Sequence, residues 1–383
     1  MTSPHSVNVP SIRFKGFTDV WEECKLEEIC NYYASSLSAK HINNEGIYDL
    51  YDANTIIGKT NTDCMKEDYI TIIKDGAGVG RTRLLPKGSM FLGTMGAITP
   101  RNSNLDFLYQ LVSNANLGSL YTGSTIPHIY FKDYGKNTYH VPHIVEQEQI
   151  GAFFYNIDHY ITFYRYKYDK LQNIKKSMLE KMFPKNGSNI PEIRFAGFTD
   201  AWEQRKLSDL IIEYKETVDS DCTLPVLTSS KTEGVVLQEE HFGRVQNHDI
   251  TGYNILPRNY CTYRNRSDGV DFTFNINRCC DKGIISKFYP VFYGNNSDIF
   301  FISMVLNYCD EVVHEIAYTC TGTGQKVLSF LDLQKMNIRV PSYDEQKKIS
   351  QYFEQLDNLI TLHQRKLEKL QNIKKMMLEK MFV

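Results

Sequence analysis

Two stretches of the sequence combine residue types that contact anions, and the first is a glycine-rich run. Gly76-Ala77-Gly78-Val79-Gly80 lies between Lys74 and the pair Arg81 and Arg83. A dinucleotide-binding loop has the spacing Gly-x-Gly-x-x-Gly and leads into a helix whose N-terminus meets the phosphates. This run has a different spacing, and Leu85-Pro86 follows where a helix would have to form. We therefore interpret the run as a turn that brings Lys74, Arg81 and Arg83 close to an anionic partner. A solvated surface loop is the alternative.

The second stretch places arginine beside asparagine and tyrosine, in Arg258-Asn259-Tyr260 and Tyr263-Arg264-Asn265-Arg266. Arg and Asn are the side chains whose paired hydrogen-bonding groups match the edges of guanine and adenine. This pattern indicates Arg258, Arg264 and Arg266 as DNA-binding candidates. The surrounding segment, 203–341, is nevertheless acidic, with 14 Lys and Arg against 18 Asp and Glu. Because the whole chain has a net charge of −2, a DNA-binding face has to be local, and a free-standing promiscuous nucleic-acid binder is disfavoured.

No motif in the sequence has the spacing of a catalytic or metal site. There is no Walker A sequence, no Asn/Asp-Pro-Pro-Tyr/Phe methyltransferase run and no convincing Asp…Glu-x-Lys nuclease cluster. His140-x-x-His143 has no third ligand in reach by sequence. We therefore expect a non-catalytic protein that holds neither a metal ion nor a cofactor.

Composition favours a cytoplasmic protein with two or three domains. The chain has 383 residues and is 42% hydrophobic, which is enough to form buried cores. Its nine cysteines include no Cys-x-x-Cys pair, so we expect them to be reduced. The N-terminus has no signal-peptide pattern, and no apolar run approaches the roughly 18 residues that span a membrane.

The elements that must position the candidate residues are two long helices, because one stretch of sequence occurs twice. Residues 146–183 are repeated as residues 345–382, at a constant offset of 199. Apolar or aromatic residues recur in each copy at alternating steps of four and three, which is typical of a coiled-coil seam. The seam positions are Ile150, Phe154, Ile157, Ile161, Tyr164, Tyr168 and Leu171, then Ile349, Phe353, Leu356, Ile360, His363, Leu367 and Leu370. We expect each copy to form a helix of roughly 57 Å and the two to pack antiparallel within one molecule. Homodimerisation through each helix is the alternative.

A second repeat precedes each globular segment. Residues 12–22, Ile-Arg-Phe-Lys-Gly-Phe-Thr-Asp-Val-Trp-Glu, return as residues 193–203, Ile-Arg-Phe-Ala-Gly-Phe-Thr-Asp-Ala-Trp-Glu, and contain the only two tryptophans. The chain is therefore a duplication of short motif, globular segment and long helix. The globular segments share little except their ends, where Thr122-Gly123-Ser124 corresponds to Thr321-Gly322-Thr323.

These patterns predict an α+β fold with a pseudo-twofold internal repeat, in which two globular domains are separated by two long antiparallel coiled-coil helices. The strand-like runs are 68–73 and 283–289, and the short helices are expected at 105–112 and 298–308. We place the domains at 1–142 with the motif 12–22, and at 186–341 with the motif 193–203. The spacer helices are placed at 143–185 and 342–383.

The two Ile-Arg-Phe-x-Gly-Phe-Thr-Asp-x-Trp-Glu motifs and the two Glu-Gln-x-x-Ile helices ending in Leu-Glu-Lys-Met-Phe resemble the specificity subunit of type I restriction–modification systems. The resemblance covers essentially the whole chain. It implies that each globular segment is a target-recognition domain that reads one half of a split, asymmetric DNA site. It also adds four residues of the Thr-Gly-Ser/Thr turns to the candidate DNA-binding positions: Thr122, Ser124, Thr321 and Thr323.

The resemblance also implies partners. The paired helices would hold the readers apart and dock two copies of a DNA adenine methyltransferase subunit, and a restriction and translocase subunit would join the complex. A two-headed scaffold that binds proteins and no DNA is the alternative. The steep salt dependence of duplex binding separates the two hypotheses.

Overall fold

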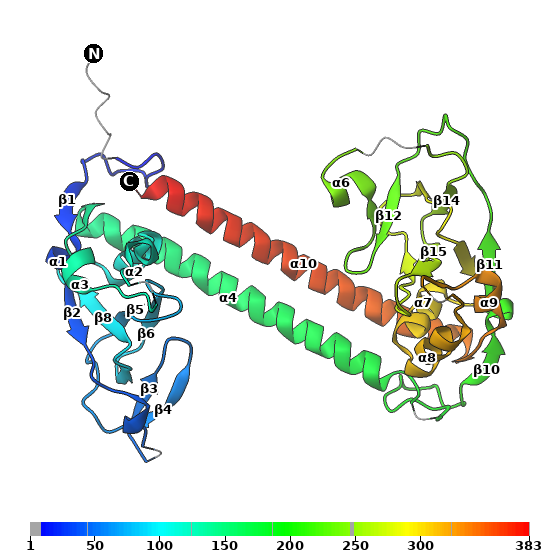
Figure 1. The fold of residues 1–383 in the computed structure, drawn as a ribbon, viewed down its shortest axis with the longest axis horizontal. Coiled ribbons are helices and arrows are strands. Elements are labelled where there is room, and N and C mark those ends of the chain that lie inside the picture. Colours follow the sequence, from blue (N-terminus) through cyan, green and yellow to red (C-terminus); the bar gives the residue numbers. More distant parts are fainter. Residues whose placement is uncertain are drawn as a thin grey trace. The chain divides into compact units, whose positions relative to one another are not determined.

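The chain separates into two units that share both of its long helices. The computed structural model describes residues 9–43, 45–123, 125–185, 187–245, 249–322 and 324–382. The first unit comprises Met1–Lys167 with His363–Val383, and the second comprises Tyr168–Leu362. Helices α4 (Ile144–Lys181) and α10 (Tyr343–Met381) therefore contribute one end to each unit (Figure 1).

The first unit is built around a four-stranded antiparallel sheet. Its strands, in spatial order, are β2 (Cys30–Ala34), β8 (Met95–Pro100), β5 (Tyr69–Ile73) and β6 (Thr82–Leu85). Smaller elements are the ribbon of β1 (Glu22–Lys25) and β9 (Thr138–Val141), the sheet of β4 (Ile56–Thr60), β3 (Tyr48–Tyr51) and β7 (Ser89–Phe91), and helices α1 (Leu26–Ile29), α2 (Leu105–Asn114) and α3 (Phe131–Tyr134). The strand expected over 68–73 is confirmed as β5. All five of its residues are buried, as is usual for a central strand.

The second unit repeats this plan. Its four-stranded sheet has the order β11 (Ile211–Tyr214), β19 (Val291–Gly294), β15 (Cys261–Thr262) and β17 (Asn275–Ile276). The ribbon of β10 (Glu203–Lys206) and β21 (Asn337–Val340) corresponds to β1 and β9. The remaining elements are β12 (Leu227–Ser230), β13 (Gly234–Leu237), β14 (Asn254–Pro257), β18 (Lys282–Ile285), β16 (Arg266–Ser267), β20 (Lys326–Val327), α5 (Leu207–Leu210), α6 (Gln238–Phe242), α7 (Ile299–Tyr308), α8 (Asp310–Thr319) and α9 (Phe330–Lys335).

Helices α2 and α7 begin at equivalent side-chain caps. The Asn104 side chain accepts a hydrogen bond from the Phe107 N–H, and Asp298 does the same for Phe301. Asn and Asp are preferred at this position because they satisfy a backbone donor that has no partner within the helix. Both short helices are therefore where the sequence predicts them.

Within each unit, α4 and α10 pack antiparallel. In the first unit the Asp158 carboxylate lies 2.6 Å from Lys374 Nζ, and further along α4 the Tyr164 ring meets Lys366, which comes earlier on α10. In the second unit Lys175 Nζ lies 2.6 Å from the Asp357 carboxylate. These contacts lie within one chain, so the expected intramolecular pair is confirmed.

The end of each long helix completes the core of the unit it enters. Phe382, which follows α10, lies against Trp21 and Phe107 in the first unit, at ring-centroid distances of 6.4 and 5.5 Å. Phe183, which follows α4, lies in the same way against Trp202 in the second unit, at 6.0 Å. The repeated Leu-Glu-Lys-Met-Phe endings therefore form equivalent contacts around the two repeated tryptophans.

Candidate nucleic-acid interface

A buried ion pair connects each repeated motif to the start of a long helix. The Arg13 guanidinium donates to both carboxylate oxygens of Glu146, at 2.6 and 2.7 Å, and Arg194 does the same to Glu345, at 2.6 Å for both contacts. The hydrogen bonds to the carboxylates raise the pKa values of both arginines, although burial opposes this. Such paired contacts fix orientation as well as charge.

The glutamine that follows each of these glutamates holds the helix against the recognition segment. Gln147 donates to the Pro142 carbonyl at 2.9 Å and accepts from the Asn104 N–H at 3.0 Å. Gln346 makes the equivalent contacts with Pro341 and Asp298, both at 3.0 Å. The repeated Glu-Gln pair thus holds the start of each long helix against the divergent segment of its unit.

In the first unit, the predicted turn and the Thr122 segment lie side by side. The Ile129 N–H donates to the Lys74 carbonyl at 2.9 Å, and the Gly76 N–H donates to the Pro127 carbonyl at 3.0 Å. His128 Nδ1 lies 2.8 Å from the Asp75 carboxylate, so this contact is side chain to side chain as well. Thr122 pairs with His128 through two backbone hydrogen bonds of 2.8 Å.

The last glycine of this turn is explained by close packing. Gly80 has φ of +81°, and a Cβ atom there would lie 2.2 Å from the Gly118 backbone nitrogen. Only glycine combines this backbone conformation with so close an approach. The run is therefore a turn, as expected from its spacing, and it packs against a neighbouring backbone segment.

The two arginines after the turn have different surroundings. Arg81 is exposed and donates through Nη2 to the Ala53 carbonyl at 2.7 Å and to the Asn54 side chain at 2.6 Å. The Arg83 guanidinium lies 5.2 Å from the centre of the Tyr51 ring, and its buried Nη1 has no hydrogen-bond partner among the described residues.

In the second unit, Arg264 and Arg266 line a cavity of about 650 Å³. The Arg266 guanidinium stacks on the Phe288 ring at 4.5 Å, whereas Arg264 is exposed and forms no hydrogen bond or ion pair within the described part of the chain. Lys231 also lines the cavity, where it pairs with Asp271. The acidic sequence around Lys231 concealed it as a candidate.

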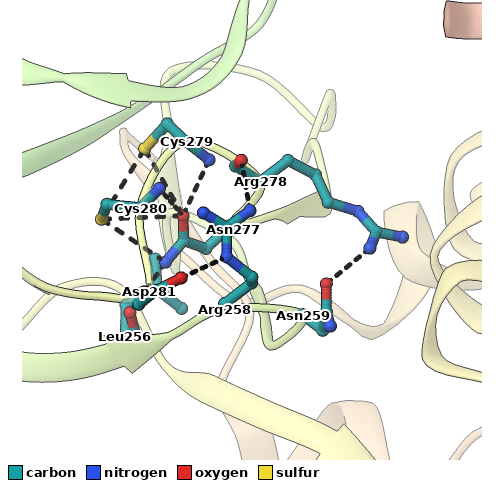
Figure 2. A network of polar contacts seen from close by, with 8 residues as sticks. All are labelled: Leu256, Arg258, Asn259, Asn277, Arg278, Cys279, Cys280 and Asp281. Atoms are coloured by element: carbon teal, nitrogen blue, oxygen red, sulfur yellow. Dashed lines mark hydrogen bonds and ion pairs between the residues drawn. The ribbon is translucent and has the colours of Figure 1, made fainter.

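Arg258 lies in a separate polar network (Figure 2). Its Nε donates to Asp281 at 2.7 Å and its Nη1 donates to the Arg278 carbonyl at 2.9 Å. Asn277 anchors the same network, because its side chain donates to the Leu256 carbonyl at 3.0 Å and accepts from the N–H groups of two following cysteines. Arg258 therefore uses its donors within the protein.

The Thr-Gly turns of the two units have the same register. Thr321 pairs with Val327 through backbone hydrogen bonds of 3.0 and 2.8 Å, as Thr122 pairs with His128. The remaining two candidates of these turns, Ser124 and Thr323, lie outside the described residues.

The structure reveals that the two candidate clusters occupy equivalent places. The Leu328 N–H donates to the Asn265 carbonyl at 3.0 Å, which matches the bond from Ile129 to Lys74. Arg266 pairs with Val327 as residue 75 pairs with residue 128. The residues directly after β5 and β15, 74–75 and 265–266, therefore lie beside the Thr-Gly turn of their unit. Arg81 and Arg83 instead contact residues 51–54. Sequence comparison missed this equivalence, since the two segments share few letters and their lengths obscure the register. It also missed the Asp75–His128 contact, which joins residues far apart in sequence.

Comparisons with other proteins agree with this duplicated plan. The family model described as "Type I restriction modification DNA specificity domain" matches residues 18–173 and 281–372. The specificity subunit of the type I restriction enzyme MjaVIII from Methanocaldococcus jannaschii is 23% identical over 379 residues, covering 91% of this chain and 85% of that protein. A crystal structure of a type I restriction–modification S subunit from M. genitalium superposes with a TM-score of 0.68 at 13% identity, covering 98% of this chain and 99% of the other, which shows a common fold.

None of the helices in the described ranges is long and apolar enough to cross a membrane.

The family match covers more than half of the sequence and includes parts of both repeats. The chain therefore belongs to the DNA specificity subunits of type I restriction–modification systems.

Proposed function

We propose that the chain reads a bipartite, asymmetric DNA site, each unit reading one half through its own divergent segment. The observation that carries this proposal is the contrast between an identical framework and different recognition segments. The Arg–Glu pairs, the Gln contacts and the four-stranded sheet recur in both units. Two different segments held on one framework imply two different half-sites and hence a non-palindromic target.

The side chains proposed to contact DNA are the basic residues that follow β5 and β15 in the chain, together with the Thr-Gly turns. Lys74, Arg81 and Arg83 follow β5, and Arg264 and Arg266 follow β15. Arg264 has no partner among the described residues that would have to be displaced, and arginine can bind guanine through two hydrogen bonds. We keep the candidates Thr122, Thr321, Ser124 and Thr323 for contacts with the backbone or base edges. Arg258 is the weakest candidate, because Asp281 already neutralises it.

We further propose that the chain itself is not catalytic. Two copies of a DNA adenine methyltransferase subunit would supply methyl transfer, and a restriction and translocase subunit would supply cleavage. The target-recognition domains would be residues 1–142 and 186–341, and the helices 143–185 and 342–383 would connect them and dock partners. A chain with a net charge of −2 suits a reader that relies on partners for much of its grip on phosphate.

The experiment is to co-express the chain with its methyltransferase subunit and to map methylated adenines on plasmid DNA. We expect a split, asymmetric motif with a fixed gap. Replacement of residues 22–142 by those of another specificity subunit should change one half of the motif only. Absence of methylation together with absence of salt-dependent duplex binding would favour the protein scaffold instead.

Single substitutions test the residue assignments. Arg81→Ala and Arg264→Ala should each weaken binding to the mapped site by about 1–3 kcal/mol, with a smaller effect on a random duplex. Equal losses on both duplexes would reduce these residues to phosphate contacts. Unchanged binding would remove them from the interface.

A further inference from the structure

The repeated motif contains an exposed loop that the duplication has preserved. Gly16-Phe17-Thr18-Asp19 and Gly197-Phe198-Thr199-Asp200 are identical, and in both the threonine and the aspartate are exposed. The loops also have the same conformation, with φ of +106° at Gly16 and +95° at Gly197. Positions on either side of the loop are exposed too, yet they differ between the copies: Lys15 corresponds to Ala196, and Val20 to Ala201. Recent duplication alone therefore does not account for the identity.

Internal packing does not account for it either. The fold uses the arginine paired with a glutamate, the buried tryptophan and the first phenylalanine of each motif, which packs against an aromatic ring of a long helix. Thr18, Asp19, Thr199 and Asp200 form no hydrogen bond or ion pair with any described residue. Within their own units the two aspartates act only through their charge, which helps to raise the pKa values of Arg13 and Arg194. An exposed side chain that forms no hydrogen bond within its own unit, and is nevertheless the same in both, indicates an external contact.

An unpaired donor lies in the same motif in both units. One nitrogen of each motif arginine, Nη1 of Arg13 and of Arg194, is buried and has no hydrogen-bond partner among the described residues. A buried donor without an acceptor is costly, so an acceptor from outside the chain would be well placed there. In the second unit a cavity of about 220 Å³ adjoins this arginine and the loop, and it is lined by, among others, Arg194, Thr199, Asp200, Asn296, Tyr343 and Gln346.

Charge decides the kind of partner. The stretches 16–22 and 197–203 each contain two carboxylates and no Lys or Arg. An acidic loop repels the phosphate backbone of DNA and attracts a basic protein surface. Because the loop is the same in both units while the recognition segments differ, its partner is the same protein twice.

We propose that the Gly-Phe-Thr-Asp loop of each unit, together with Nη1 of its motif arginine, is a docking site for one copy of the methyltransferase subunit. The partner contributes a basic side chain to the loop aspartate and an oxygen acceptor to the arginine. This site lies outside the long helices, and its assignment to the methyltransferase rests on the proposed function.

The test counts partner copies on variants of the full-length chain. Asp19→Lys, Asp200→Lys and the double variant are each co-purified with the methyltransferase subunit, and the copies bound are counted by native mass spectrometry. The wild type should carry two copies, each single variant one, and the double variant none. Titration should show that binding at each altered site weakens by about thirtyfold or more, the range for losing one partner of a buried charge pair at an interface.

Matched controls come from the chain itself. Lys15→Ala and Val20→Ala give the first loop the neighbours that the second loop has, and both should retain two copies. Thr18→Ala with Thr199→Ala provides a milder pair that should also weaken docking. Unchanged thermal unfolding confirms that each variant folds.

Two results would overturn the docking site. One is a folded double variant that still binds two copies with wild-type affinity, and the other is a wild-type chain that binds none. Loss of DNA binding with both copies retained would assign the loops to DNA instead. The proposed reading of DNA is judged separately, from the methylation pattern and duplex binding of the wild type, so the two proposals can fail independently.

Discussion

At the scale of single residues, the buried Arg–Glu pairs link the two kinds of repeat. Glu146 is 1% exposed and Glu345 is 0% exposed, and each accepts two hydrogen bonds from a motif arginine. A buried carboxylate needs such a partner, since an unpaired charge away from water is strongly unfavourable. The arginine and the glutamate are therefore kept together in both copies, although they lie in separate repeats.

We expect Glu146→Gln to destabilise the first unit by about 3–5 kcal/mol, because it leaves the Arg13 charge buried without its counterion. Native-state hydrogen exchange should show the loss at amides of the first unit. Glu345→Gln is the matched variant and should act on the second unit. A change below about 1 kcal/mol would mean that water compensates the arginine.

His363 is the polar member of the coiled-coil seam. Burial and the charges of Lys167 and Lys366 lower its pKa, its Nδ1 has no hydrogen-bond partner among the described residues, and its ring lies 5.6 Å from that of Tyr164. The folded chain therefore holds the proton less tightly than the unfolded chain, whose histidine titrates near 6.5. The free energy of unfolding is therefore at its full value above about pH 6.5, and it falls as the pH drops from there toward the lowered pKa of His363.

His363→Leu should remove this loss of stability at low pH, because leucine suits a seam position and has no group that binds a proton. Thermal unfolding between about pH 5 and about pH 8 would show a smaller dependence on pH than in the wild type. His159→Gln, an exposed change on α4, serves as the control and should leave the wild-type profile intact. Identical profiles for His363→Leu and the wild type would exclude His363 as the source of the pH dependence.

At the scale of elements, each long helix begins in one unit and ends in the core of the other. The residues that close the cores, Phe183 and Phe382, come directly after α4 and α10 and reach the repeated tryptophans. This exchange explains why the repeat continues to the last turn of each helix. A helix that served only as a spacer would not need the same aromatic residue at its end.

Phe183→Ala should destabilise the second unit by about 3–5 kcal/mol through the cavity that it leaves beside Trp202. Phe382→Ala is the matched change and should act on the first unit, beside Trp21. Hydrogen exchange resolved by segment distinguishes the two. Loss of protection in the unit where the helix begins would contradict the exchange of helix ends.

At the scale of the whole molecule, the first motif contacts the end of α10 in the same way that the second motif contacts the end of α4. The Ile12 N–H donates to the Lys380 carbonyl at 3.1 Å, and the Ile193 N–H donates to the Lys181 carbonyl at 2.9 Å. In the second case the chain itself connects the two residues. In the first unit the same contact joins Ile12 and Lys380, which are far apart in sequence.

A circular permutant that starts at Gly187, joins Val383 to Met1 and ends at Asn186 should therefore fold and methylate the same DNA site with its partners. Tolerance is expected because Ile12 and Lys380, the residues to be connected through the new junction, already lie within hydrogen-bond distance. Soluble expression, thermal unfolding and methylation mapping check it. A permutant that unfolds at a much lower temperature would show that the 181–193 connection is required for stability.

The sequence by itself determined the duplicated order of motif, segment and helix, the two helices, their seam and the glycine-rich turn. These features are local: letter identity, a period near 3.5 residues and glycine spacing are all present in the linear chain. The short helices were likewise predicted from their apolar runs, at 105–112 and 298–308, and the structure has them at Leu105–Asn114 and Ile299–Tyr308.

Only the tertiary structure decided which distant residues meet. It placed Asp75 against His128, gave Arg258 an internal partner in Asp281 and left Arg264 without one among the described residues. It also placed residue 74 and residue 265 at equivalent positions beside the segments that follow the Thr-Gly turns. Such contacts join residues far apart in sequence, and strand pairing fixes them without any periodic signal in the loops. The physical reason is that the backbone groups which join these segments are the same in nearly every residue, so the sequence of a loop does not show which distant segment it will meet.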